Sequence, residues 1–221
     1  MKNIRILLCD DHALLRDGIK SLLDDSDNYY VVAEASNGKE MISKYNNLLP
    51  DIIIADISMP ELSGPDALKQ LRRRYPDIKV LFISMYTGEQ YIYLIMQSGG
   101  MGLIGKDIEK GELFFALDQI YAGNKYFGPL YDENKLKEIN DKYSGKSSKS
   151  ILQLTEPPTE TETQILLYIA NGLTSEQIAQ NMGLAKRTID SYRSNMICKF
   201  DLKTKQDLMR VAIIFSESKK L

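Results

Sequence analysis

The stretch RILLCDDHALL, residues 5–15, passes directly from an apolar run to two adjacent carboxylates. Residues 6–9 are all apolar, which is typical of a strand that is buried on both faces of a sheet. Asp10 and Asp11 follow at once, and two neighbouring carboxylates repel each other unless a cation neutralises them. We therefore expect a positively charged partner at this strand end, shared with residues from elsewhere in the chain.

Four further runs within the first 125 residues have the composition of this strand, and helical patterns separate them. Strands that alternate with helices favour βαβ units. The alternation predicts an α/β fold with a doubly wound, five-stranded parallel sheet covered by helices on both faces. Right-handed crossovers then bring the carboxyl ends of all strands to one edge. The expected strands are residues 4–9, 30–35, 52–55, 80–83 and 102–104.

Polar residues follow three of the other strands at that edge. Asp56 and Ser84 come directly after the third and fourth strands, and Lys106 comes shortly after the fifth. Taken singly, such residues are more often solvated surface or turn residues. Together with Asp10 and Asp11, however, Asp56 supplies carboxylate oxygens of the kind that Mg²⁺ prefers beside phosphate, and Ser84 and Lys106 could hold the phosphoryl oxygens. Because an aspartate can also attack phosphorus to form an acyl phosphate, the edge is predicted to be a magnesium-dependent phosphoryl site.

The alternation of strands and helices ends near residue 125, and the composition changes from residue 129 onward. Residues 132–150 are polar and rich in lysine, which predicts a linker with a helical first half around Leu136 and Ile139. All of the chain beyond it has helical patterns. The predicted organisation is therefore a unit of residues 1–125, a linker of residues 126–152 and a small all-α domain of residues 153–221.

The second unit has the pattern of a helix-turn-helix. Thr159 and Glu162 have the spacing of a capping box, and Ser175 is expected to cap a short helix that Gly183 ends. A longer helix begins near residue 185, and the second helix of such a pair enters the major groove of DNA. From residue 151 onward there are nine Lys or Arg against eight Asp or Glu, a net charge of +1. DNA binding would then depend on one basic face, and the alternative is a small bundle that binds protein.

The composition of the whole chain is that of an ordinary globular protein. Hydrophobic residues make up 43% and charged residues 26% of 221 positions, and the formal net charge is −2, which excludes a global basic field. Cys9 and Cys198 lie in different halves, so we expect reduced thiols rather than a disulfide. No leader sequence and no apolar run of membrane-spanning length is found, and we expect a cytoplasmic protein without membrane contact.

Four segments of the first unit together resemble the receiver domain of bacterial two-component response regulators. They are DDH with Arg16 and Gly18, IIIADISMPELSG, LFIS and GLIGKD. The resemblance implies a flavodoxin-like sheet order and transfer of a phosphoryl group to Asp56 from a phosphohistidine of a sensor kinase. In the implied site, Asp56 is the phospho-acceptor, and Ser84 and Lys106 lie beside the phosphoryl group. The implied ligands of Mg²⁺ are Asp11, Asp56, the backbone carbonyl of Ser58 and, largely through water, Asp10.

Three positions near this implied site carry further expectations. Leu103 stands three residues before the lysine, where the family usually has Tyr or Phe, so an aromatic switch coupled to Ser84 is not implied. Ser58 and Tyr86 stand two residues beyond the acceptor and the hydroxyl, and we expect their side chains to set the lifetime of the acyl phosphate.

Residues 159–200 resemble the LuxR-type, four-helix DNA-binding domain, and the whole chain resembles the NarL/FixJ class of response regulators. Asp190 stands where many members carry Lys, which predicts weaker non-specific affinity and a changed base preference, since a carboxylate can accept a hydrogen bond from cytosine. The implied DNA-binding residues are Lys186, Arg187, Thr188, Asp190, Ser191, Arg193, Ser194 and Lys199, and the implied dimer surface is Leu208, Val211, Ala212 and Phe215.

The resemblance implies a transcription regulator rather than a metabolic enzyme. Its partners would be a sensor histidine kinase, double-stranded DNA and a second copy of the chain, with pairing promoted by phosphorylation or DNA. One alternative is a phosphatase with an aspartyl nucleophile, but His12 occupies the place of the second acid in the Asp-x-Asp pair that such enzymes carry. A flavin-binding protein would need a Ser/Thr/Gly-rich phosphate loop after the first strand, which is missing. A receiver whose helical half binds protein remains a third alternative.

Overall fold

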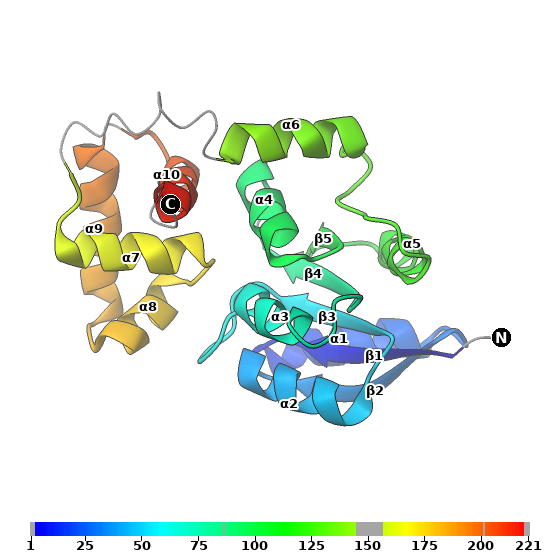
Figure 1. Cartoon of the computed structure of the whole chain (residues 1–221). Coiled ribbons are helices and arrows are strands. Elements are labelled where there is room, and N and C mark those ends of the chain that lie inside the picture. Colours follow the sequence, from blue (N-terminus) through cyan, green and yellow to red (C-terminus); the bar gives the residue numbers. More distant parts are fainter. Residues whose placement is uncertain (1–2, 86, 145–156, 201, 219–221) are drawn as a thin grey trace. The chain divides into compact units, whose positions relative to one another are not determined.

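A computed structural model of the chain describes residues 3–85, 87–144, 157–200 and 202–218 (Figure 1). The chain divides into two compact units, one of residues 1–87 and 95–131 and the other of residues 88–94 and 132–221. The predicted domain limits at residues 125 and 152 stay predictions. Tyr86 and residues 145–152 of the predicted linker lie outside the described residues.

The first unit contains a five-stranded parallel sheet with the strand order β2-β1-β3-β4-β5. Both the predicted α/β class and the flavodoxin-like order implied by the resemblance are therefore confirmed. Each strand lies within one residue of its expected limits, and β3, β4 and β5 extend one residue further toward the carboxyl edge. The strands are β1 (Ile4–Cys9), β2 (Tyr29–Ala35), β3 (Ile52–Asp56), β4 (Val80–Ser84) and β5 (Gly102–Gly105).

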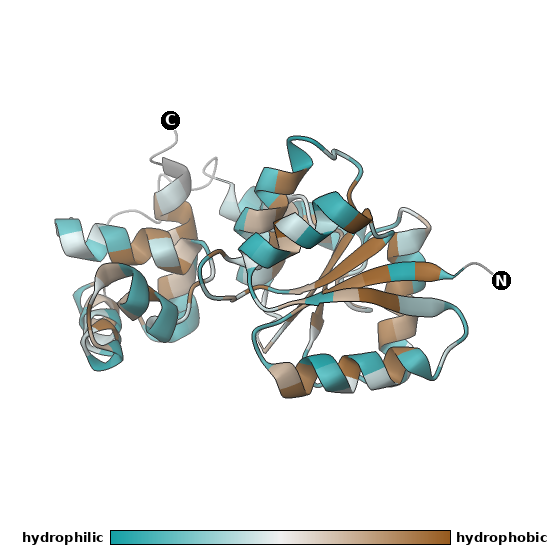
Figure 2. Ribbon diagram, turned by 90° about the horizontal axis from the view of Figure 1, so that it is seen from below, coloured by the Kyte–Doolittle hydropathy of each residue, from teal (hydrophilic) through white to brown (hydrophobic). Residues whose placement is uncertain are grey.

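Helices cover both faces of this sheet, and the strands between them carry mostly hydrophobic residues (Figure 2). Every residue of β3 and β4 is buried, as expected for strands covered on both sides. The apolar core therefore ends where Asp56 and Ser84 end their strands, and it holds those polar groups at a fixed edge. The helices of this part of the chain are α1 (Ala13–Asp24), α2 (Gly38–Leu48), α3 (Gly64–Arg72), α4 (Glu89–Ser98) and α5 (Lys110–Tyr121).

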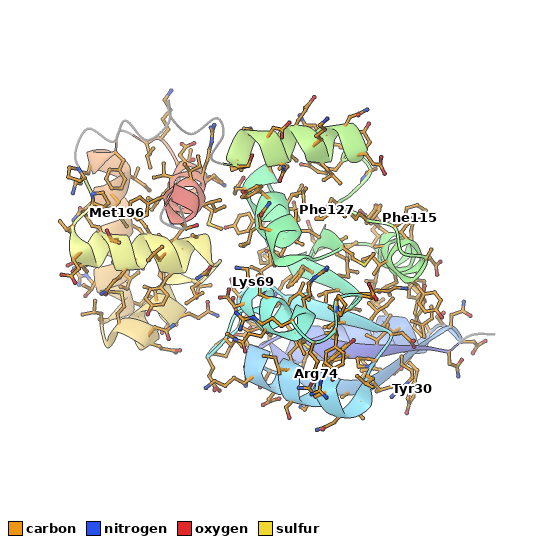
Figure 3. The ribbon with its side chains drawn as sticks, viewed as in Figure 1. Tyr30, Lys69, Arg74, Phe115, Phe127 and Met196 are labelled. Carbon is orange, nitrogen blue, oxygen red and sulfur yellow. The ribbon has the colours of Figure 1, made fainter. Side chains whose placement is uncertain are left out.

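The outer strands of the sheet differ in how their edges are covered. At β5, Leu103 donates a backbone hydrogen bond to Tyr126 at 3.1 Å, and Tyr126 donates one to Met101 at 2.9 Å. The segment around Tyr126 therefore occupies the hydrogen-bonding groups of that edge. On β2, at the other edge, Tyr30 is 61% exposed, and Figure 3 labels it together with Phe115 of α5, which is also exposed.

The second unit is entirely helical over its described residues. In α7, Thr159 accepts a hydrogen bond from the backbone of Glu162 while Glu162 accepts one from the backbone of Thr159, so the predicted capping box is confirmed. Met196 of α9, labelled in Figure 3, is fully buried in this unit. The helices are α6 (Glu133–Tyr143), α7 (Glu160–Ala170), α8 (Ser175–Met182), α9 (Lys186–Lys199) and α10 (Lys205–Ser218).

The prediction that Ser175 caps the short helix α8 is wrong. Thr174 is the N-cap, and it forms a second capping box with Gln177. Ser175 is the first helical residue, and its buried hydroxyl accepts a hydrogen bond from Arg193 at 3.1 Å. Gly183 ends the helix with a φ of 67°, a left-handed conformation that glycine adopts without strain, as predicted.

The helical first half of the predicted linker is confirmed as α6. Leu136 and Ile139 are both buried, and the ring of Tyr143 stacks on that of Tyr93 in α4 with 5.5 Å between ring centroids. Lys142 of α6 also forms an ion pair with Glu89 at the start of α4. In the part of the chain that the structure describes, no helix combines the length and apolar character needed to cross a membrane.

Candidate functional site

The carboxyl edge of the sheet gathers three of the predicted side chains into direct contact. The Nζ atom of Lys106 lies 2.8 Å from Oδ2 of Asp10 and 2.9 Å from Oδ2 of Asp56. Asp10 follows β1, Asp56 ends β3 and Lys106 follows β5, so the parallel topology alone brings them together. Asp10 and Asp56 are only 0% and 5% exposed, so their charges depend on this ammonium group rather than on water.

The β1–α1 turn adds an acid and an imidazole at the surface of this group, and Asp10, Asp11, Asp56 and Lys106 together are called the acid pocket below. Nδ1 of His12 lies 2.8 Å from Oδ1 of Asp11 and 3.1 Å from Oδ1 of Asp10. The backbone N–H of His12 also donates to Oδ1 of Asp10 at 2.8 Å. One ligand atom each from Asp10, Asp11, His12 and Asp56 lies within 4.8 Å of all the others. His12 was not predicted as a site residue, although its place beside the acid pair was a signal of this contact.

Two serines complete the predicted set. Ser84 is buried at the end of β4, and its carbonyl accepts a hydrogen bond from the backbone N–H of Lys106 at 3.0 Å. Ser58 follows Asp56 in the β3–α3 loop, and its backbone donates a hydrogen bond to the Asp56 carboxylate. Ser58 is therefore near Asp56 along the chain, and Ser84 is hydrogen-bonded to Lys106 across the sheet edge.

Close packing fixes the loop that follows Asp56. A Cβ atom added to Gly64 would lie 2.2 Å from the carbonyl oxygen of Asp56, so only glycine allows α3 to begin there. Glu61 has a φ of 62°, in the left-handed region that is unfavourable for a residue with a side chain. The backbone N–H of Gly38, at the start of α2, donates to the carbonyl of Leu62 at 3.0 Å and supports this strained turn.

The pocket shifts the pKa values of the two groups at its centre. Burial, and then repulsion by Asp10, raises the pKa of Asp56 to about 6, although Lys106 and the Ser58 backbone act in the opposite direction. Burial disfavours the charge of Lys106, but attraction by Asp56 and hydrogen bonds to both aspartates outweigh it and raise the Lys106 pKa. The ammonium therefore stays charged, and Asp56 ionises less readily than an ordinary aspartate.

The oxygen donors of this acidic cluster fit a hard divalent cation. Three carboxylates converge at one partly open edge, and they are oxygen donors of the type that Mg²⁺ takes with several waters. Lys106 supplies a single positive charge, which does not balance three ionised acids. The acidic cluster is therefore of the kind that is typical of a Mg²⁺ site.

Leu103 is only 2% exposed in the middle of β5, packed in the sheet rather than turned outward. An aliphatic side chain of this kind has no hydroxyl or aromatic ring with which to contact the serine of the neighbouring strand. Leu103 therefore cannot serve as an aromatic switch residue.

The predicted recognition helix, α9, presents one continuous polar face. Its buried residues, Ile189 and Met196, lie on the opposite side, as the spacing predicted. Asn195 and Cys198 lie on the exposed face in addition to predicted residues, and the three- and four-residue spacing from Ser191 would have revealed them. The exposed positions are Lys186, Arg187, Asp190, Ser191, Ser194, Asn195 and Cys198.

The remaining predicted DNA contacts are partly used inside the unit. Arg193 donates from Nη1 to Ser175 and from Nη2 to the carbonyl of Leu173, both at 3.1 Å, which ties α9 to the start of α8. The Nζ atom of Lys199 lies 2.8 Å from Oε2 of Glu162, which ties the end of α9 to α7. Thr188 is half-buried. The structure thus separates an outward-facing group of predicted residues from a group that holds the helix in place.

The predicted dimer surface lies on α10. Leu208, Val211 and Ala212 are each no more than 5% exposed within this single chain, whereas Phe215 is half-buried. Pairing through the first three would therefore require them to leave the contacts that they make in this conformation.

The chain belongs to the response regulators that combine a receiver domain with a LuxR-type domain. Residues 6–118 match the family model described as "Response regulator receiver domain", and residues 157–212 match the one described as "Bacterial regulatory proteins, luxR family". It is thus a two-component response regulator whose second unit is a LuxR-type helix-turn-helix DNA-binding domain, as the resemblance implied. Neither the phosphatase nor the flavoprotein alternative finds support.

Individual relatives agree with this class. The transcriptional regulatory protein YdfI of Bacillus subtilis is 31% identical over 209 residues, which cover 95% of each chain. A crystal structure of a LuxR-family two-component response regulator from Aurantimonas sp. SI85-9A1 is 28% identical with a TM-score of 0.56, and the match covers 64% of this chain and 98% of that one. The RcsB response regulator in its DNA complex has a TM-score of 0.58 at 19% identity, covering 98% and 99%, a likeness of fold alone.

Proposed function

We propose that Asp56 receives a phosphoryl group from a phosphohistidine of a sensor kinase, and that this modification controls DNA binding by α9. The observation that carries the proposal is the pair of contacts from Lys106 to Asp10 and Asp56, at 2.8 and 2.9 Å. These contacts hold a nucleophilic carboxylate, a second acid and an ammonium group in one pocket, and phosphoryl transfer to a side chain requires all three kinds of group.

In the proposed reaction, one carboxylate oxygen of Asp56 bonds to phosphorus while the bond from phosphorus to the imidazole nitrogen of the kinase breaks. The electron pair of the broken bond stays on the imidazole, and the product is an acyl phosphate. Lys106 stabilises the negative charge on the phosphoryl oxygens, and the Ser84 hydroxyl donates a hydrogen bond to one of them. Because Asp56 is buried, few waters reach the acyl phosphate to hydrolyse it.

Asp10, Asp11 and Asp56, with the backbone carbonyl of Ser58, would hold Mg²⁺, and Asp10 would do so largely through water. When bound, Mg²⁺ neutralises the acids and the incoming phosphoryl group. Removal of the repulsion between Asp10 and Asp56 favours the ionised form of Asp56, whose pKa lies near 6 in its absence. With a pKa near 6 the nucleophile is already mostly ionised at neutral pH, and bound Mg²⁺ would keep it ionised in more acidic solution as well.

For DNA, we propose that the exposed face of α9 enters the major groove. Lys186 and Arg187 would contact phosphates, and Asp190, Ser191 and Ser194 would face base edges. Thr188, Arg193 and Lys199 are proposed as further phosphate contacts, and the last two would exchange part of their internal bonding for a phosphate. The exposure of the first five residues along one side of α9 supports this assignment.

Phosphorylation or DNA is proposed to promote pairing of two chains through Leu208, Val211, Ala212 and Phe215, so that the dimer reads two half-sites. The proposed chemistry of the chain is the gain and loss of its own phosphoryl group rather than turnover of a metabolic substrate. Its proposed partners, a kinase domain and chromosomal DNA, place its work in the cytoplasm.

The test is to phosphorylate the full chain with acetyl phosphate and Mg²⁺ and to measure its binding to sheared genomic DNA by sequencing of the bound fragments. Phosphorylation should enrich specific fragments and shift the chain toward a dimer in light scattering. Asp56→Asn should show neither effect, whereas Asp77→Asn, an exposed aspartate of the same unit, should behave as the wild type. Equal enrichment by wild type and Asp56→Asn would contradict control through Asp56, and absence of any DNA binding would favour a helical unit that binds protein.

A further inference from the structure

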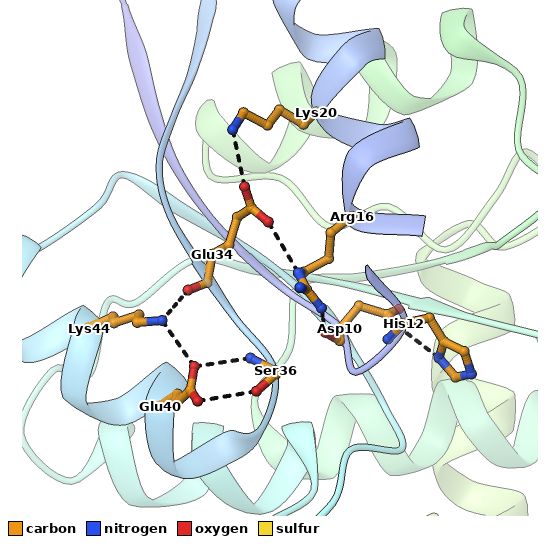
Figure 4. Close-up of polar contacts among 8 residues, drawn as sticks. All are labelled: Asp10, His12, Arg16, Lys20, Glu34, Ser36, Glu40 and Lys44. Atoms are coloured by element: carbon orange, nitrogen blue, oxygen red, sulfur yellow. Dashed lines mark hydrogen bonds and ion pairs between the residues drawn. The ribbon is translucent and has the colours of Figure 1, made fainter. Parts of the chain in front are cut away.

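An arginine that lies outside the acid pocket reaches one of its backbone groups. Arg16, the fourth residue of α1, donates from Nη1 to the carbonyl oxygen of Asp10 at 2.7 Å (Figure 4). The same guanidinium donates from Nε to Oε2 of Glu34 in β2 at 3.2 Å. Its side chain is only 18% exposed. The guanidinium thus connects β2 to the peptide that joins Asp10 to Asp11.

Glu34 is itself held by further charges from two helices. Oε1 of Glu34 lies 3.1 Å from Nζ of Lys20 in α1. Lys44 of α2 donates to the backbone carbonyl of Glu34 and lies 3.0 Å from Oε2 of Glu40 (Figure 4). Hydrogen bonds from Lys20 and from Arg16 lower the pKa of Glu34 against the opposing effect of burial, so this carboxylate is ionised at neutral pH.

Both backbone groups of Asp10 are consequently fixed from outside its own strand. Its N–H donates to the carbonyl of Ala35 in β2 at 3.1 Å, and its carbonyl accepts from Arg16. The orientation of this peptide sets where the carboxylates of Asp10 and Asp11 point, because it determines the backbone from which both side chains project. A change of direction here would misplace two of the three acids at once.

We propose that Arg16, oriented by Glu34, is a positioning residue that aims the carboxylates of Asp10 and Asp11 at the divalent cation. The inference rests on the proposed function of the acid pocket, but it assigns a role to residues that touch neither the cation nor the phosphoryl group. The competing explanation is that Arg16 and Glu34 form an ordinary surface ion pair that contributes only modest stability.

The two explanations differ in the affinity for Mg²⁺, which an amide NMR titration of the full chain measures without any phosphodonor. Arg16→Ala should weaken Mg²⁺ binding about tenfold, the size of effect seen when a group that orients a metal ligand is removed. Arg16→Lys keeps a donor and the charge and should recover part of that loss. Glu34→Gln should weaken binding by a smaller factor, and it should add nothing to Arg16→Ala, since Glu34 acts through Arg16.

Lys20→Ala is the matched control, because Lys20 contacts Glu34 but not the Asp10 carbonyl. It should leave Mg²⁺ affinity within about twofold of the wild type, as expected for an exposed pair. A dissociation constant for Mg²⁺ that is the same in Arg16→Ala, Glu34→Gln and wild type overturns the inference, whatever happens to the melting temperature. Should Arg16→Ala not fold, Arg16→Lys and Glu34→Gln decide the question by the same criterion. If the wild type itself bound no Mg²⁺, the proposed function would fail first.

Discussion

The acid pocket of the sheet and the exposed face of α9 differ in how the fold treats their charged residues. At the sheet edge, Asp10 and Asp56 are buried, and a single ammonium group lies between them. On α9, Lys186, Arg187 and Asp190 project into solvent, and the nearest ion pair, from Lys186 to Glu176, is long at 3.5 Å and exposed. The first arrangement raises the pKa values of Asp56 and Lys106.

This difference matches what we propose that each region binds. A buried acid cluster stores repulsion that a bound cation relieves, so cation binding and the charge of the acids are strongly coupled there. Water stabilises the charged side chains of an exposed face, so they need no partner within the protein. Such a face gains affinity for DNA because binding releases counterions. Removal of one charge should therefore have a large effect at the first region and a small, salt-dependent effect at the second.

The largest expected effect is that of Lys106→Ala. Without the ammonium group, Asp10 and Asp56 repel each other uncompensated and the phosphoryl oxygens lose their cation. We expect the rate of phosphorylation by acetyl phosphate to fall about a hundredfold, as for removal of a main electrostatic group in an active site. Lys110→Ala, which removes an exposed lysine paired with Asp25, should leave the rate unchanged. Similar rates for both variants would mean that a charge buried in the acid pocket matters no more for phosphorylation than an exposed charge does.

Within the second region, Arg187→Ala and Arg193→Ala should separate binding from structure. Arg187 is exposed, so Arg187→Ala should lower DNA affinity about tenfold. The slope of affinity against salt concentration should fall by about one phosphate contact. Arg193 holds α9 to α8 through Ser175 and Leu173, so its loss should lower the melting temperature of the helical unit as well. Fluorescence anisotropy over a range of salt concentrations and thermal melts measure the two effects. Equal melting temperatures would show that Arg193 has no structural role.

A smaller effect is expected when the negative charge on this face is reversed. Asp190→Lys should strengthen non-specific DNA binding a few-fold and make its salt dependence steeper by about one to two phosphate contacts. It should also change the preferred sequence, because a lysine no longer accepts a hydrogen bond from cytosine. Selection from a random DNA library tests this point. If affinity, salt slope and preferred sequence all stayed the same, Asp190 would not face the DNA.

The smallest expected effect concerns the ion pair inside the helical unit. Hydrogen bonds from Lys199 and the Thr159 backbone outweigh burial and lower the pKa of Glu162 in the folded state. The resulting stability is therefore present above pH 4.5, the usual pKa, and is lost as the pH falls through the folded value. Glu162→Gln should cost about 1 kcal/mol in unfolding free energy at neutral pH and less in acid. Denaturant titrations measure the unfolding free energies of wild type and variant at neutral and at acidic pH. The difference between the two proteins should shrink in acid, and a difference that does not change with pH would refute the linkage.

Most of the fold could be predicted because its signals are local. Apolar runs located all five strands to within a residue, and polar residues at their ends marked the edge where Asp10, Asp56 and Lys106 meet. The cap of α8 was assigned one residue late, since Thr174 and Gln177 also have capping-box spacing and were overlooked. Both successes and this error depend on residues no more than a few positions apart.

Contacts between distant residues could not be predicted in this way. The spacing on α9 identified its polar face, but it did not show that Arg193 and Lys199 have partners on α8 and α7. Likewise, nothing in the sequence around Arg16 indicates Glu34, which lies on a different element eighteen positions away. Long polar side chains reach several neighbours, so only the packed structure decides which one they choose.

The most direct test of the central claim is to find where a phosphoryl group becomes attached. The wild-type chain should be incubated with acetyl phosphate, with and without Mg²⁺, and its intact mass and peptides measured by mass spectrometry. The account predicts one phosphoryl group per chain, carried by the peptide that contains Asp56, dependent on Mg²⁺ and absent in Asp56→Asn. A phosphoryl group on another residue, or equal labelling of Asp56→Asn, would contradict it.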